Sequence, residues 1–191
     1  MSQQELFART VDDSWFHEGN LNLLKRGTRT AIIGTRKPSR EGRIAARRVA
    51  RAAVERGEIV VSGLAIGIDE EAHRGAIGAG GRTIAVLGVP LDCIQARSTA
   101  SLQQLIGREH LLLSQFPAGS GYVAGNYPKR NRAMISICSS VIVADALEDS
   151  SGTMGAAYYA HRSMVPVFIA ARKGRARWMD TMIDDGRARR L

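Results

Sequence analysis

Three cations within four residues are the clearest chemical signal in the chain: Lys129, Arg130 and Arg132, with Asn131 between them. Guanidinium, ammonium and amide groups all donate hydrogen bonds to phosphate or carboxylate oxygens, so the predicted chemistry is anion binding. The sequence predicts a helix over residues 129–139, and a helix start already carries partial positive charge. Cations there are unfavourable unless an anion lies among them. We therefore expect this segment to hold a phosphate.

A second set of anion-binding candidates follows the apolar stretches of the chain. These loops are rich in glycine, serine or basic residues, and their candidates are Gly34, Arg36, Lys37, Ser62, Gly63, Ser151, Gly152 and Thr153. Glycine lets the backbone approach a ligand closely, and N–H groups at a helix start point toward an anion. No single loop is specific, because Gly63-x-x-x-Gly67 matches neither the dinucleotide fingerprint nor the phosphate loop of ATPases. The prediction of an anion site rests on the convergence of these loops at one edge of the sheet.

Apolar stretches of strand length alternate with segments that have small apolar residues at helical spacing. Strands are predicted at residues 30–33, 59–61, 83–87, 111–113, 141–144 and 165–169. Their nearly continuous apolar character indicates burial on both faces of a parallel sheet. The predicted class is therefore α/β: an open, mostly parallel Rossmann-like sheet with helices on both faces. We expect a single domain over residues 15–191, starting with a strand and turn at the sheet edge, after a flexible lead-in over residues 1–14.

The composition favours a polyanionic partner. The formal net charge is +9, and aromatic residues make up only 5% of the chain, which excludes a broad aromatic platform for stacking bases. Cys93 and Cys138 stand far apart in apolar surroundings, so we expect buried thiols and neither a disulfide nor a metal site. The polar N-terminus is no signal peptide, and no apolar run approaches the ~20 residues of a membrane helix. We expect a cytosolic protein with no membrane partner.

Candidates for catalysis are weaker than those for binding. Asp69 is predicted to cap a helix over residues 70–79, with Glu70 and Glu71 complementing its dipole and His73 filling a half-buried turn. No serine stands in an elbow motif, and no spacing of histidines, cysteines and carboxylates matches a metal site. The residues therefore predict neither an enzyme nor a metal centre.

Several motifs taken together resemble the Rossmann domain of the DNA-processing protein A (DprA/Smf) family. They are AIIGTRKPS, SGLAIGIDEEAHRGAIGAGGRTIAVLGVPLD, SQFPAG, GNYPKRNRAMIS and SSGTMGAAYYA, and the resemblance extends in order over residues 15–185. It implies single-stranded DNA binding and help in loading RecA during recombination and natural transformation. It also implies a homodimer that needs neither a metal nor a nucleotide cofactor. The chain is expected to hold only the Rossmann domain, without the helical and winged-helix domains of many members.

The resemblance assigns roles to individual residues. The phosphate-contacting positions of the family fall on Arg36, Ser62, Gly63, Lys129, Arg130, Asn131 and Arg132. Phe116 and Tyr127 are the aromatic residues placed to stack on a base. Cations and backbone amides grip phosphates without reading bases, so we expect sequence-independent, salt-sensitive binding. Two positions depart from the family pattern: Ile66 stands in place of an arginine and Gln115 in place of a carboxylate.

Other functions fit the same crevice. The wider superfamily includes nucleotide-binding proteins and phosphoribohydrolases, and the latter use a glutamate in a GGxGTxxE segment. The corresponding stretch here is SGTMGA over residues 151–156, with a small residue at the glutamate position. This difference argues against hydrolysis. A sensor of small nucleotides, and a scaffold that only dimerises, both remain as alternatives.

Overall fold

The computed structural model describes residues 15–25, 27–172 and 174–191. These residues form one eight-stranded sheet in the order β1-β5-β4-β3-β2-β6-β7-β8. β1 pairs antiparallel with β5, and all other neighbours are parallel. The predicted α/β class with an open, mostly parallel sheet is confirmed. The expected lead-in over residues 1–14 lies outside the described residues.

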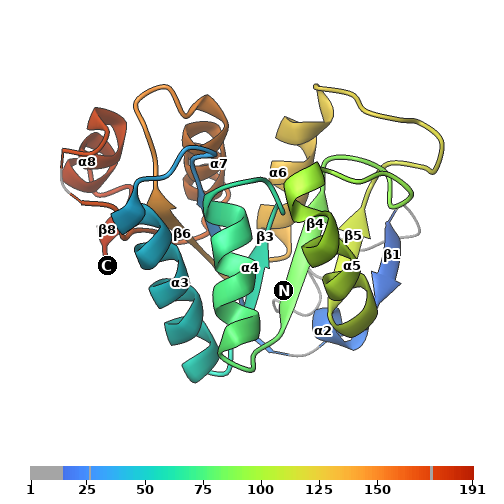
Figure 1. The fold of residues 1–191 in the computed structure, drawn as a ribbon. Coiled ribbons are helices and arrows are strands. Elements are labelled where there is room, and N and C mark those ends of the chain that lie inside the picture. The colour runs from blue at the N-terminus through green and yellow to red at the C-terminus, as the bar shows by residue number, and fades with distance from the viewer. Residues whose placement is uncertain (1–14, 26, 173) are drawn as a thin grey trace.

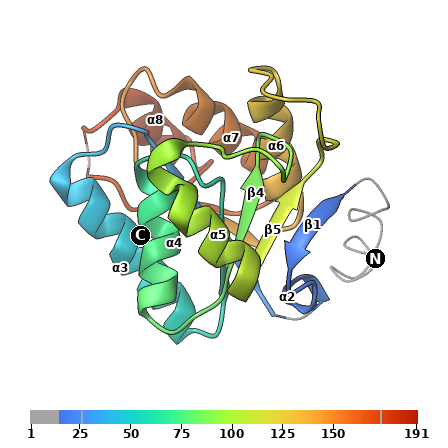
Figure 2. The ribbon, with the colours of Figure 1, turned by 45° about the vertical axis from the view of Figure 1, so that its right-hand side comes forward.

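The strands are short, and those in the middle of the sheet are almost wholly buried. Their bounds are β1 (Phe16–Gly19), β2 (Arg29–Gly34), β3 (Ile59–Ser62), β4 (Thr83–Leu87), β5 (Leu111–Ser114), β6 (Ser140–Asp145), β7 (Val167–Ile169) and β8 (Arg189–Arg190). All six predicted strands form. β7 begins after Pro166, later than predicted, because proline has no N–H to donate to a strand ladder. The predicted edge strand is β1, which Figure 2 shows beside β5.

Helices cover both faces of the sheet (Figure 1). They are α2 (Asn22–Lys25), α3 (Arg40–Glu55), α4 (Ile68–Gly78), α5 (Ala100–Glu109), α6 (Asn126–Ser136), α7 (Ser151–Arg162) and α8 (Arg177–Asp184), and a 3-10 turn, η1 (Arg97–Thr99), precedes α5. Ile32 on β2 packs with α3 and α4, whereas its neighbours Ala31 and Ile33 pack with α6, α7 and α8. This alternation is what strand geometry imposes on a sheet that is covered on both sides.

The starts of three helices determine where the site residues lie. Ser39 caps α3, with its Oγ accepting a hydrogen bond from the Gly42 N–H at 3.0 Å. α4 starts at Ile68, so the prediction that Asp69 is its N-cap is wrong. The reason is Gly67, whose φ of +93° turns the chain into the helix two residues earlier than a side-chain cap at position 69 requires.

The predicted start of α6 is also wrong. The helix begins at Asn126, so Lys129 and Arg130 lie in its second turn and not at its first residues. Pro128 is compatible with this earlier start, because the N–H groups of a first helical turn have no intrahelical acceptor. The argument from cations at a helix start therefore fails, and anion binding has to be judged from the three-dimensional surroundings of these residues.

Cys93 and His73 are packed differently from the predictions. Cys138 is buried, but Cys93 is only partly buried. His73 does not fill a half-buried turn: it is fully buried within α4, with Nδ1 2.7 Å from the Thr83 Oγ1. Burial lowers the pKa of His73 to about 3. The imidazole is therefore a neutral core group.

Candidate functional site

A pocket of about 410 Å³ lies at the carboxyl edge of the sheet, beside the ends of β2 and β6. The chain runs from β2 outward through β3, β4 and β5, and then returns to β6 on the other side of β2. Ligands bind at this kind of switch point in open α/β sheets, because the loops diverge there and leave a crevice. The predicted site residues that line the pocket are Gly34, Arg36, Lys37, Tyr127, Arg130, Asn131, Ser151, Gly152 and Thr153.

Arg130 is the most unusual of these residues, since only 4% of it is exposed. Its Nη1 lies 3.9 Å from the Asp69 Oδ2, close enough for an ion pair but too far for a hydrogen bond. Its Nε and Nη1 have no hydrogen-bond acceptor among the described residues. A buried donor without an acceptor costs free energy, and an anion entering the pocket would remove that cost.

Burial shifts the pKa values of Arg130 and Asp69 from their ordinary values. Burial lowers the pKa of Arg130, and the nearby Asp69 carboxylate partly offsets this. Burial likewise raises the pKa of Asp69, with Arg130 acting in the opposite direction. Arginine starts from so high a pKa that the guanidinium stays protonated at neutral pH. The pocket therefore has a permanent cation in its wall.

Ser62 and Gly63 lie behind Arg130 and do not line the pocket. The Ser62 hydroxyl is fully buried and donates to the Ile32 carbonyl oxygen at 2.6 Å. A Cβ on Gly63 would lie only 1.1 Å from the Arg130 Nη1, so the guanidinium occupies the space that a side chain would take. Next to it, Leu64 has a φ of +54°, a left-handed conformation that is rare for a bulky residue. This loop is shaped to accommodate Arg130.

Arg36 and Lys37 come from the β2–α3 loop and are exposed at the rim of the pocket. The Arg36 guanidinium carbon lies 5.0 Å from the centroid of the Tyr127 ring. The Arg130 guanidinium carbon lies 5.7 Å from the same centroid. Both cations are thus within cation–π range of one aromatic ring. Arginines from two separate segments converge on one side of the pocket.

The first turn of α7 faces the pocket with Ser151, Gly152 and Thr153. The N–H groups of a first helical turn lack intrahelical acceptors and carry partial positive charge. Asn131 connects this turn to α6, since its Nδ2 donates to the Gly152 carbonyl oxygen at 3.4 Å. An anion in the pocket would therefore meet Arg130 and the N-terminal end of α7 together.

Besides Ser62 and Gly63, three further predicted residues lie outside the pocket lining. Lys129 and Arg132 are exposed on α6, and the Arg132 guanidinium lies 5.8 Å from the Tyr159 ring centroid. Phe116 is half-buried and also lies away from the lining. The binding roles predicted for these three residues stay predictions.

Tyr122 is a residue that the sequence did not single out. It is 67% exposed, and its ring centroid lies 5.9 Å from that of Tyr127, with the ring planes tilted by 55°. Asp69 and Asp149, which line the pocket, were likewise not predicted to contribute to it. The turn-rich loop before α6 gives no periodic signal from which the position of Tyr122 could be read. Its place five residues before Tyr127 is the only hint.

Among residues 15–25, 27–172 and 174–191, no cluster of three histidines, cysteines or carboxylates could hold a metal ion. Within those ranges, no helix is long and apolar enough to cross a membrane.

Comparisons with known proteins agree with the fold and with the motifs. The DNA recombination-mediator protein A family model matches residues 11–189. The DNA processing protein DprA of Streptococcus pneumoniae is 40% identical over 131 residues, which cover 69% of this chain and 46% of the relative. The chain thus spans about half the length of that relative.

Two solved structures are similar over most of the chain. The X-ray structure of DprA from Streptococcus pneumoniae has a TM-score of 0.87 at 33% identity, covering 97% of this chain and 66% of that one. The Helicobacter pylori DNA processing protein A, described for its single-stranded DNA binding mode, has a TM-score of 0.85 at 28% identity, covering 92% and 80%. The matched motifs, the sheet and the extent of the family match show that the chain belongs to the DNA recombination-mediator protein A family.

Proposed function

We propose that the chain binds single-stranded DNA through this pocket and acts in DNA processing and recombination. The observation that carries the proposal is the Arg130 guanidinium, which is buried in the pocket wall with Nε and Nη1 lacking an acceptor in the described chain. A backbone phosphate supplies the missing acceptor oxygens. The single-stranded DNA binding described for the Helicobacter pylori relative supports this choice of ligand.

The remaining pocket residues suit a strand of phosphates. Arg36 and Lys37 add positive charge at the rim, and the first turn of α7 adds backbone donors. None of these groups reads the edge of a base, so binding is independent of sequence. Tyr127 and the exposed Tyr122 offer ring faces for a base next to the bound phosphate.

A titration tests this function. A labelled single-stranded oligonucleotide is added to the protein at several salt concentrations, and the Kd is measured at each. We expect micromolar or tighter binding at low salt, with log K falling linearly against log salt by roughly 0.7 to 1 for each phosphate contact. Oligonucleotides of different sequence give the same Kd. No binding of the oligonucleotide at low salt contradicts the proposal.

A mononucleotide sensor is the second candidate, because a pocket of about 410 Å³ falls within the range that holds small molecules. Competition distinguishes the two. AMP displaces a labelled oligonucleotide only at a large excess if the pocket serves DNA, and binds tightly by itself if it serves a nucleotide. Release of free adenine from AMP would instead indicate a phosphoribohydrolase.

The finer roles implied by the family are also proposals. We infer that the chain assists RecA loading in natural transformation, works as a homodimer and is cytosolic, on the strength of family membership. The chain spans 46% of the length of the Streptococcus pneumoniae relative, so each role needs its own test. Light scattering at micromolar concentration gives the mass of the assembly, and RecA filament formation on coated single strands measures loading.

A further inference from the structure

Asp145, the last residue of β6, holds both ends of the loop that carries Arg36 and Lys37. Its backbone carbonyl oxygen accepts a hydrogen bond from the Thr35 N–H at 2.9 Å. Its carboxylate Oδ2 accepts another from the Ser39 N–H at 3.1 Å. The segment between these two anchors contains the two rim cations. The position of this loop therefore depends on where the Asp145 carboxylate points.

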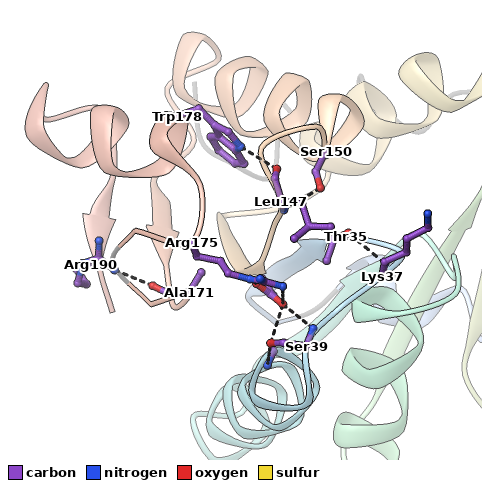
Figure 3. Close-up of polar contacts among 11 residues, drawn as sticks. Thr35, Lys37, Ser39, Leu147, Ser150, Ala171, Arg175, Trp178 and Arg190 are labelled. Carbon is purple, nitrogen blue, oxygen red and sulfur yellow. Dashed lines mark hydrogen bonds and ion pairs between the residues drawn. The ribbon is translucent and has the colours of Figure 1, made fainter.

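The Asp145 carboxylate is packed too closely to move without disturbing its neighbours. The residue is only 2% exposed, and a Cβ on Gly42 would lie 2.1 Å from its Oδ2. A buried carboxylate is stable only where cations or donors compensate its charge. Its cation is Arg175, which donates from Nε to Oδ1 at 2.8 Å and from Nη2 to Oδ2 at 3.3 Å. Figure 3 shows Arg175 reaching from the C-terminal segment toward Ser39.

The same C-terminal segment also holds the β6–α7 loop. The Arg177 N–H donates to the Glu148 Oε2 at 2.7 Å, and the Trp178 Nε1–H donates to the Leu147 carbonyl oxygen at 3.4 Å (Figure 3). Leu147 lines the pocket. Residues 175–178 are thus connected to both loops that flank the pocket, although Arg175 itself lies outside the lining.

We propose that Arg175 is a positioning residue for DNA binding: through Asp145 it fixes the loop that presents Arg36 and Lys37 to the phosphate held by Arg130. Arg175 touches no phosphate, and it acts on affinity only through that loop. This inference rests on the proposed DNA-binding function.

The test uses Arg175→Lys, which keeps the charge but cannot make the two-point contact with Asp145. We expect the affinity for a single-stranded oligonucleotide to fall by a factor of about 2 to 30, the range for residues that act on a ligand without touching it. The slope of log K against log salt falls by no more than in a chain that carries Arg36→Ala and Lys37→Ala, because the phosphate contacts that Arg175 affects are those of these two cations. The matched control is Arg190→Lys, which removes a guanidinium that bridges the Asp180 Oδ1 at 2.8 Å and the Ala171 carbonyl oxygen at 2.7 Å in the same C-terminal region. We expect it to leave the affinity unchanged.

A double-mutant cycle separates positioning from a general loss of stability. In a chain that already carries Arg36→Ala and Lys37→Ala, the loop has no cation left to present. Arg175→Lys then has no further effect on affinity if the residue is a positioning residue, and the same effect as in the wild type if it acts by stabilising the fold. Thermal unfolding of each variant shows that all are folded at the assay temperature.

Three results overturn the inference: an unchanged affinity in Arg175→Lys, an equal loss in Arg190→Lys, or an undiminished effect of Arg175→Lys in the chain that carries Arg36→Ala and Lys37→Ala. These results leave the proposed function standing, provided that the wild type binds the oligonucleotide. A wild type that does not bind contradicts the proposed function itself, and this inference with it.

Discussion

The arginines of α3 and those of the pocket differ in what surrounds them. The outer face of α3 exposes five arginines: Arg40, Arg43, Arg47, Arg48 and Arg51. Three of these form ion pairs with carboxylates: Arg43 and Arg47 pair with Glu71, and Arg51 pairs with Glu55. Arg130 instead is buried, and although its Nη1 lies 3.9 Å from the Asp69 carboxylate, its Nε and Nη1 have no hydrogen-bond acceptor in the described chain.

This difference separates the charge that attracts a polyanion from the charge that binds it. A solvated or paired arginine gains little from a phosphate, because water or a carboxylate must first be displaced. A buried guanidinium without acceptors has already lost its water. On the proposed function, the net charge of +9 supplies long-range attraction, and the pocket is where a phosphate would be held.

The largest effect is expected from Arg130→Ala. It removes the buried guanidinium. We therefore expect the free energy of binding to single-stranded DNA to become less favourable by about 2 kcal/mol, and the slope of log K against log salt to fall by about 1. Oligonucleotide titrations at several salt concentrations measure both quantities. An unchanged slope would show that Arg130 contacts no phosphate, and the difference between the two groups of arginines would then have no functional meaning.

Gly63→Ala tests the difference between the two groups of arginines by displacing the Arg130 guanidinium instead of removing it. The new Cβ would lie 1.1 Å from the present position of the Arg130 Nη1, so the guanidinium must shift. We expect weaker binding, by less than in Arg130→Ala, and no additional loss when the two changes are combined. Gly78→Ala is the matched control, since a Cβ there meets nothing within 4 Å. If Gly63→Ala binds DNA as tightly as the wild type, the placement of Arg130 does not matter.

Tyr122→Ala tests the aromatic side of the pocket. Stacking of a base on an aromatic ring contributes about 1 kcal/mol or more, so the affinity falls while the salt slope stays constant. Fluorescence titration against a short oligonucleotide measures the change. Phe116→Ala provides the contrast. Neither Phe116 nor Tyr122 lines the pocket, but Tyr122 is 67% exposed and lies against the lining residue Tyr127, whereas Phe116 is half-buried. We therefore expect the loss of Phe116 to leave the affinity unchanged. The reverse order of effects would favour the stacking role predicted from the sequence for Phe116.

The smallest effect is expected from Arg48→Gln on the exposed face of α3. The change alters the affinity for a short oligonucleotide by less than about twofold, and only at low salt, because its influence is long-range and screened. Arg36→Ala, measured in parallel, lowers the salt slope by about 1. Equal slopes for the two variants would remove the distinction between the helix face and the pocket.

The fold was predictable because buried strands are recognisable in the sequence as runs of apolar residues. Apolar strands covered on both faces contain few polar residues, and Ser39 precedes its helix with the side chain that a cap requires. The start of α6 was not predictable by the same reasoning. Pro128 is tolerated within a first turn as well as before one, so its presence does not locate the helix start.

The site was predictable in its composition but not in its arrangement. The sequence showed a basic cluster, but not that Arg130 alone among its cations is buried, because that depends on the space left by Gly63 in a distant loop. Asp145 could be read only as a turn carboxylate, since its partners Ser39 and Arg175 lie far from it in the chain. Such contacts arise from the packing of the sheet and have no local signature.

The most direct test of the central claim is the structure of the complex with a short single-stranded oligonucleotide. We expect a backbone phosphate within hydrogen-bond distance of the Arg130 guanidinium and of the first-turn N–H groups of α7, with Arg36 beside it. An oligonucleotide that lies along the arginines of α3, with the pocket unoccupied, would contradict the account.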